Sequence, residues 1–168
     1  MAPELLDPST PLANDEVIFR RVLPRRNHYS RDGNSLRVSS QAFSDEEMKP
    51  SVDRECVVKD LGGPTYTQQS PENGVLQLLV QDVRSIPKLK VMNERGKPVK
   101  PEREHAADVL PAPIKGDPVL PDNPAHCEIT LMPQLAPESV FRRLQEKLAR
   151  MATNKGNAAW AIVPPDAV

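Results

Sequence analysis

The sequence predicts an α+β fold: a single domain in which a mixed or antiparallel sheet of about five or six strands carries one C-terminal amphipathic helix. Two observations predict it. Short runs rich in β-branched and aromatic residues recur along the chain and outnumber the helical patterns. One stretch near the C-terminus instead has the periodicity of an amphipathic helix. A length of 168 residues suits one such domain with its own core.

The composition favours a folded chain with long loops. Apolar residues make up 38% of the sequence and charged residues 27%, which is outside the range typical of disordered chains. The 19 prolines punctuate the chain between the strand-like runs. We expect a mobile or surface-draped tail over residues 1–14, the domain over residues 15–163, and a short C-terminal tail over residues 164–168.

The first half of the domain is predicted to contribute most of the sheet. Residues 17–23 combine β-branched and aromatic side chains and stop at Pro24, which predicts a strand. Residues 75–80 are nearly all apolar and should form a central strand buried on both faces. Asp82 is expected to cap one helical turn that ends before Pro87. Further strands are predicted at residues 36–39, 51–58 and 88–92.

Two proline-containing segments are expected to lack regular structure. Residues 60–73 surround a Gly-Gly-Pro turn. Residues 93–121 are charged and hold six prolines, and an irregular connection of that length inside a compact domain is often functional or mobile. We expect residues 93–121 to form a Pro-rich surface excursion that returns to a loop at Asn123.

The C-terminal third predicts the helix and the last strand. Pro137 suits the first position of a helix, and Glu138 suits the positive end of its dipole. The helix should span residues 137–152. A final strand should follow at residues 159–163. Its apolar stripe consists of Phe141, Leu144, Leu148 and Met151.

A candidate site is predicted where the turn at Asn123-Pro124 leads into a strand that carries His126 and Glu128. Because side chains alternate along a strand, His126 and Glu128 should share a polar face, while Cys127 lies on the buried one. Glu128 could orient the His126 ring as a general acid or base. We assign these two residues as the candidate catalytic pair.

Arginines on several predicted strands suggest an anion-binding role, because their planar fork matches phosphate oxygens. The candidate ligand-binding residues are Arg20, Arg37, Ser39, Asp53 and Arg54. A salt-bridged sheet face, in which Arg37, Asp53, Arg54 and Glu128 pair across strands, explains the same residues and is the preferred interpretation.

Metal, cofactor and nucleotide-loop chemistry find little support. Neighbouring His126 and Cys127 point to opposite faces of a strand and cannot both bind one zinc ion in regular geometry. The sequence contains no GxxxxGK[ST], GxGxxG after a strand, GxSxG or HExxH motif. Cys56 and Cys127 are expected to be buried thiols rather than a disulfide. We predict no metal and no cofactor.

Charge and hydropathy limit the classes of partner that the sequence predicts. A net charge of −1 gives no global attraction to nucleic acid or to an anionic membrane. The most basic stretch, residues 20–31, leaves nucleic acid open as a partner, although a solvated loop explains it more simply. No run of apolar residues approaches the length of about 18 that a membrane helix needs, so we expect a cytoplasmic protein without a membrane partner. The basic side chains of this stretch are Arg20, Arg21, Arg25, Arg26, His28 and Arg31.

The order of four segments resembles a group of short uncharacterised bacterial proteins. The segments are FRRV at 19–22, LRVSSQAF at 36–43, SVDR at 51–54 and NPAHCEI at 123–129. The similarity spans residues 17–129, and this chain differs in carrying a cysteine at position 127 and a long proline-rich insertion before the loop. The resemblance implies a compact bacterial module and no particular activity.

These observations predict a small bacterial interaction module that acts with a protein partner and without catalysis, because catalytic motifs are missing and long loops could order on binding. The alternative is an enzyme or binding protein for a phosphate-bearing small molecule or nucleotide, with His126 as acid or base and an arginine cluster as the anion clamp. The two differ in one testable respect. The alternative requires His126 and arginines to line one cleft.

Overall fold

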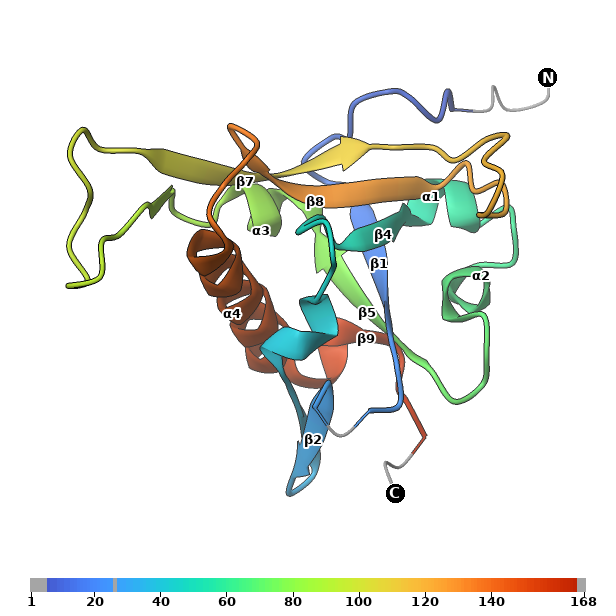
Figure 1. The fold of residues 1–168 in the computed structure, drawn as a ribbon. Coiled ribbons are helices and arrows are strands. Elements are labelled where there is room, and N and C mark those ends of the chain that lie inside the picture. The colour runs from blue at the N-terminus through green and yellow to red at the C-terminus, as the bar shows by residue number, and fades with distance from the viewer. Residues whose placement is uncertain (1–5, 26, 166–168) are drawn as a thin grey trace.

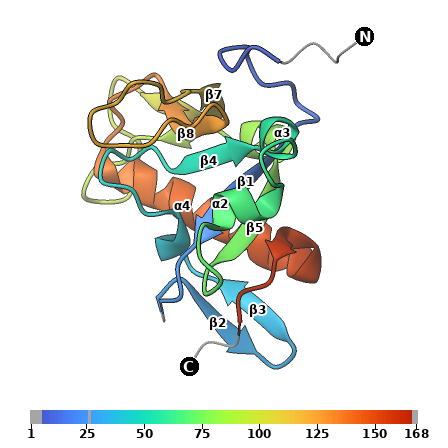
Figure 2. The ribbon, with the colours of Figure 1, turned by 90° about the vertical axis from the view of Figure 1, so that its right-hand side faces the viewer.

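The computed structural model describes residues 6–25 and 27–165 and confirms the α+β fold. Within these residues, seven strands form one antiparallel sheet in the order β6-β7-β8-β4-β1-β5-β9, one strand more than the largest number predicted. The hairpin of β2 and β3 forms a separate two-stranded sheet that projects from the body of the domain (Figures 1 and 2). The predicted tail residues 1–5 and 166–168, and Arg26 of the basic stretch, lie outside the described residues.

Strands β1 and β5 follow the predicted apolar runs closely, whereas β2 forms within the basic stretch that was interpreted as a loop. The strands are β1 Val17–Val22, β2 Tyr29–Asp32, β3 Ser35–Val38, β4 Ser51–Arg54, β5 Gly74–Leu79, β6 Leu89–Lys90, β7 Glu104–Pro111, β8 His126–Met132 and β9 Trp160–Ile162. The helices are α1 Glu55–Val58, α2 Pro64–Gln68, α3 Val80–Arg84 and α4 Glu138–Lys155, with 3₁₀ turns at Ser40–Phe43 and Gly156–Ala159.

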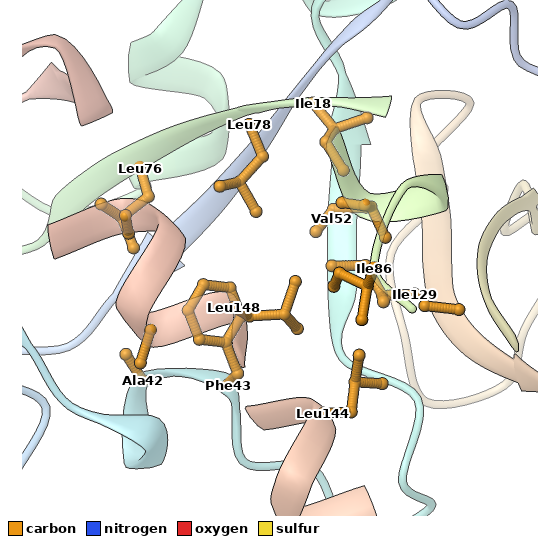
Figure 3. Packing of buried hydrophobic residues seen from close by; sticks show 14 of the residues in the cluster. Ile18, Ala42, Phe43, Val52, Leu76, Leu78, Ile86, Ile129, Leu144 and Leu148 are labelled. Carbon is orange, nitrogen blue, oxygen red and sulfur yellow. The ribbon is translucent and has the colours of Figure 1, made fainter. Parts of the chain in front are cut away.

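Helix α4 packs on one face of the sheet through the apolar stripe that the sequence predicts. Leu144 and Leu148 are fully buried, and Met151 packs at the margin of the same cluster. Figure 3 shows Leu144 and Leu148 directed toward Val52, Ile129 and other side chains of the sheet. The helix runs three residues beyond the predicted end, to Lys155, and its last turn anchors the hairpin because Thr153 Oγ1 accepts a hydrogen bond from the Val38 amide at 3.0 Å.

The opposite face is covered by the short helices α1 and α2 (Figures 1 and 2). Phe19 and Val75 on this face pack against Val58 of α1. Strand β5 is therefore buried on both faces, as expected, but it lies next to the edge strand β9 rather than at the centre of the sheet. Helices on the two faces bury it. A continuous apolar run indicates that a strand is buried on both faces, but not whether it lies at the centre of the sheet or near its edge.

Two local predictions in this region are wrong. The strand expected at residues 51–58 ends at Arg54, and Glu55 begins α1, so Cys56 lies in a helix. Residues 60–73 contain α2, which starts with Pro64 in its first turn. Both helices cover the second face of the sheet. This tertiary packing overrides the alternation of apolar and polar residues over 51–58 that suggested a longer strand.

The prediction of an irregular excursion over residues 93–121 is also wrong. Glu104–Pro111 forms β7, an eight-residue strand between β6 and β8. His105, Ala107 and Val109 point inward and alternate with more exposed neighbours. Alanine and aspartate are depleted in strands, and their presence here concealed the alternation. Pro111 ends the strand and the other prolines lie before or after it, so the connections on both sides of the strand are irregular.

Helix α3 lacks the predicted cap. Leu79 occupies the N-cap position and no side chain caps the helix there. Asp82 instead forms an ion pair with Lys155 at the end of α4, with an N–O distance of 2.5 Å. Asp82 thus ties two helices together rather than starting one.

The N-terminal segment joins the domain earlier than residue 15. Leu12 is part of the core, and the Thr10 carbonyl accepts a hydrogen bond from Arg54 at 2.6 Å. Residues 6–14 therefore drape over the domain with specific contacts. Cys56 and Cys127 are both free thiols, but only Cys127 is buried as predicted, whereas Cys56 is partly exposed. Burial raises the pKa of Cys127 to about 12. None of the described helices is both long enough and apolar enough to span a bilayer.

Candidate functional site: an arginine-lined cleft

A cavity of about 310 Å³ opens beside the first residues of β4 and β8. We call it the arginine cleft because Arg20, Arg21 and Arg25 line it, together with two histidines, His28 and His126. The other polar side chains that line it are Ser44, Ser51, Asp53, Thr67, Gln69 and Asn123. The walls come from β1, β4, α2 and the loop that precedes β8, so segments far apart in the sequence converge here.

Strand pairing explains why polar groups gather on one face. The register of β4 and β8 places Asp53 opposite His126 and Ser51 opposite Glu128. The residues between them, Val52 and Cys127, also face one another and are buried on the other side. Paired residues of an antiparallel ladder point the same way, so the predicted polar face of His126 and Glu128 is confirmed.

His126 is held by two hydrogen bonds, neither of which involves Glu128. Its Nδ1 lies 2.8 Å from the carbonyl oxygen of Ala112, and its Nε2 lies 3.0 Å from the hydroxyl of Ser51. A carbonyl only accepts, so Nδ1 carries the proton, and in the neutral ring Nε2 accepts a hydrogen bond from Ser51 Oγ. The prediction that Glu128 orients the ring is therefore wrong: a backbone carbonyl after β7 does so. The side chain of Glu128 makes no hydrogen bond or ion pair among the described residues, and it does not line the cleft.

Arg20 is fixed in place by three backbone carbonyls. Its Nε, Nη1 and Nη2 donate to Ala42, Ser51 and Ser44 at 3.0, 2.8 and 3.1 Å. Burial lowers the pKa of Arg20 to about 10, which leaves it charged at neutral pH. No carboxylate of the described residues lies within ion-pairing distance of it. The carbonyls accept from three of its five N–H groups, and the charge of Asp45, which is not close enough for an ion pair, partly opposes the lowering of its pKa.

Among the described residues, Asp53 supplies the one carboxylate that lines the cleft. It is buried and accepts hydrogen bonds from Thr67 Oγ1 at 2.8 Å and from Asn123 Nδ2 at 2.9 Å. Asn123 is held in turn by Tyr66, whose hydroxyl donates to its amide oxygen at 3.2 Å. These neutral donors fix Asp53 without neutralising it, and α2 contributes two of the partners in this network.

His28 is buried beside the cleft with an unpartnered ring nitrogen. It is 7% exposed, and its Nδ1 has no hydrogen-bond partner among the described residues. Burial is the main cause that lowers the pKa of His28, and the positive charges of Arg25 and Arg20 lower it further. A buried ring nitrogen without a partner is unusual in a folded protein and marks a place where a ligand atom would be stabilised.

Four of the seven predicted site residues lie elsewhere. Arg37 and Ser39 line a separate groove between the β2–β3 hairpin and α4. Arg54 is 1% exposed and forms an ion pair with Glu16. Only Arg20, Asp53 and His126 meet in the cleft, and Glu128 lies outside it.

The predicted salt-bridged sheet face is wrong as well. Arg54 pairs with Glu16 from the N-terminal segment, and Asp53 is held by neutral groups. The pairing fails because Arg54 is turned toward the side of the sheet opposite Asp53. Cleft residues that the sequence did not assign to a site include Arg25, His28, Ser51, Thr67 and Asn123. The basic loop and the turn before β8 had drawn attention to three of these, but nothing in the sequence placed them together.

The described residues contain no group of three or more histidine, cysteine or acidic side chains arranged to hold a metal ion. Comparison with protein-family models, with curated proteins and with solved structures gave no match. The resemblance to short bacterial proteins stays a prediction.

Proposed function

We propose that this protein binds a small ligand bearing phosphate or a comparable oxyanion in the arginine cleft. One observation carries the proposal. Three arginines surround a cavity of about 310 Å³, and none of them is paired with a carboxylate of the described residues. Arginine side chains that meet at a cavity without counter-ions favour an anionic ligand, although the chain as a whole has a net charge of −1.

The three arginines would contribute differently. Arg20 is preorganised by its carbonyl partners, so binding costs little side-chain entropy there. Arg21 and Arg25 are exposed and can adjust to the ligand. The fixed carboxylate of Asp53 repels a second anionic group and favours a hydroxyl or amine on the ligand. The cavity volume, at the lower end for ligand pockets, favours a phosphorylated small molecule over a dinucleotide.

A thermal-shift experiment tests the proposal. Phosphate and small phosphate esters should raise the melting temperature of the wild type, because they bind the folded state; at a ligand concentration of 100 Kd the gain is about 2.7 kcal/mol. Arg25→Ala and His126→Ala should lose the shift. Arg37→Ala is the matched control, since Arg37 is exposed and lines the other groove. A shift that is equal in all four proteins, or that chloride reproduces at the same ionic strength, would contradict the proposal.

His28 should make the folded state sensitive to acid. Its lowered pKa means that the unfolded chain binds the proton more readily, so stability is lost as the pH falls below the unfolded-state pKa of about 6.5 toward the lower folded value. One such group contributes a slope of at most about 1.4 kcal/mol per pH unit. His28→Leu should remove this part of the slope between pH 7.5 and 5 in urea unfolding. An unchanged slope would show that the ring is not held neutral.

The protein-partner function favoured by the sequence stays a prediction, as do the nucleic-acid alternative and the cytoplasmic location. Val119 and Leu135 are the most exposed large apolar side chains of the described residues, at 86% and 96%. They lie on different loops. Single exposed apolar residues of this kind do not define a docking face.

A further inference from the structure

The structure also contains an arrangement for covalent catalysis in the arginine cleft, which the sequence did not reveal. We infer that Ser51 is a nucleophile, His126 its general base, and that the cleft hydrolyses a carboxylic ester bearing an anionic group. The choice of an anionic substrate rests on the proposed function. The nucleophile itself rests on separate geometry, described next.

The hydrogen-bond chain runs in the direction that activates a serine. The carbonyl of Ala112 fixes the proton on Nδ1 of His126, at 2.8 Å, and so presents Nε2 as an acceptor. Ser51 Oγ lies 3.0 Å from Nε2 and donates to it. A nucleophile within reach of a base that is itself oriented by a third group is the arrangement of serine hydrolases, here with a carbonyl in place of the usual carboxylate.

Position in the fold supports the same role. Ser51 and His126 are the first residues of β4 and β8, which pair directly, so the two side chains are held by the rigid sheet. The side chain of Ser51 is exposed and lines the cavity, so a substrate can reach Oγ. Sites built on strands hold their geometry better than sites on loops.

Arg20 lies next to the backbone of Ser51. Its Nη1 donates to the carbonyl of that residue at 2.8 Å. Its positive charge would stabilise the oxyanion of a tetrahedral intermediate. The exposed Arg21 and Arg25 would hold the anionic group of the substrate.

The reaction balances with water as the only co-reactant. Ser51 Oγ forms a bond to the ester carbonyl carbon while its proton passes to Nε2 of His126. The intermediate collapses, the bond from carbon to the leaving oxygen breaks, and His126 returns the proton to the departing alkoxide. Water, deprotonated by His126, then attacks the acyl carbon. The bond from that carbon to Ser51 Oγ breaks, His126 returns the proton to Oγ, and the acid is released.

Two 4-nitrophenyl esters test this inference: the glutarate monoester, which carries a carboxylate, and the neutral butyrate. The wild type should hydrolyse the anionic ester faster, and Arg25→Ala should lose the preference. Ser51→Ala should reduce the release of nitrophenolate to the rate in buffer. His126→Ala should lower kcat by a factor of about 10²–10⁴. Ser30→Ala is the matched control and should behave as wild type, because this exposed serine lies in the other groove. Acid quenching should trap a glutaryl adduct on Ser51.

The outcomes separate this inference from the proposed function. If Ser51→Ala hydrolyses both esters like the wild type, or if the wild type does not exceed the buffer rate, Ser51 is not a nucleophile; a phosphate-induced thermal shift in Ser51→Ala would show that anion binding stands alone. If Ser51 is required but both esters react equally and Arg25→Ala has no effect, the anionic substrate class is overturned.

Discussion

Glu16→Ala is expected to lower the free energy of unfolding by about 3–5 kcal/mol. The reason is the position of Arg54, whose side chain is 1% exposed. Its Nε and Nη2 donate to the two carboxylate oxygens of Glu16 at 3.0 and 2.9 Å, which is a bidentate pair. Removing the carboxylate leaves a buried cation with only the Thr10 carbonyl, at 2.6 Å, as a described partner. Urea unfolding monitored by circular dichroism measures the loss.

Two variants control for other causes. Glu138→Ala removes the exposed partner of Arg142 on α4, and such a pair contributes at most about 1 kcal/mol. The double variant Glu16→Leu with Arg54→Met replaces the ion pair by apolar side chains and should recover most of the stability. A cost for Glu16→Ala no larger than that for Glu138→Ala would show that Arg54 reaches solvent.

Leu144→Ala is expected to cost about 2–5 kcal/mol. Leu144 is 0% exposed in the cluster between α4 and the sheet, and the change removes its packing and leaves a cavity. Figure 3 shows it on α4 at the margin of the drawn cluster, on the side of Ile86 and Ile129. Leu135→Ala is the control, because that leucine is 96% exposed just before the same helix. An unchanged denaturation midpoint for Leu144→Ala would contradict the packing of α4 on the sheet.

The sequence predicted those elements whose patterns are local. Strand β1 and the stripe of α4 follow from regular spacing of apolar side chains, and both agree with the structure. Strand β7 was not predicted, because its inward-facing residues include His105 and Ala107, which are not residue types typical of strands. The end of β4 at Arg54 was not predicted, because it depends on α1 covering the second face of the sheet, which is a property of the tertiary structure.

The site was predictable only in part for a similar reason. Alternation placed His126 on a polar face, which is a local property. The Ala112 carbonyl that orients its ring is backbone and leaves no mark in the residue type. Arg54 was predicted to bind a ligand because its ion-pair partner could not be recognised from the sequence. That partner, Glu16, lies 38 positions away in the N-terminal segment. Residues such as Thr67 and Asn123 join the site through folding of α2 and the loop before β8.

The most direct test of the arginine cleft uses the three histidines of the chain as reporters. His28 and His126 line the cleft, whereas His105 lies on β7 with its Nδ1 2.6 Å from the Pro133 carbonyl. NMR spectra of the imidazole rings should be followed while inorganic phosphate is added at constant pH and ionic strength. The account predicts that the signals of His28 and His126 shift together and saturate, while those of His105 stay in place. Signals that do not move, or that move equally for all three rings, would contradict it.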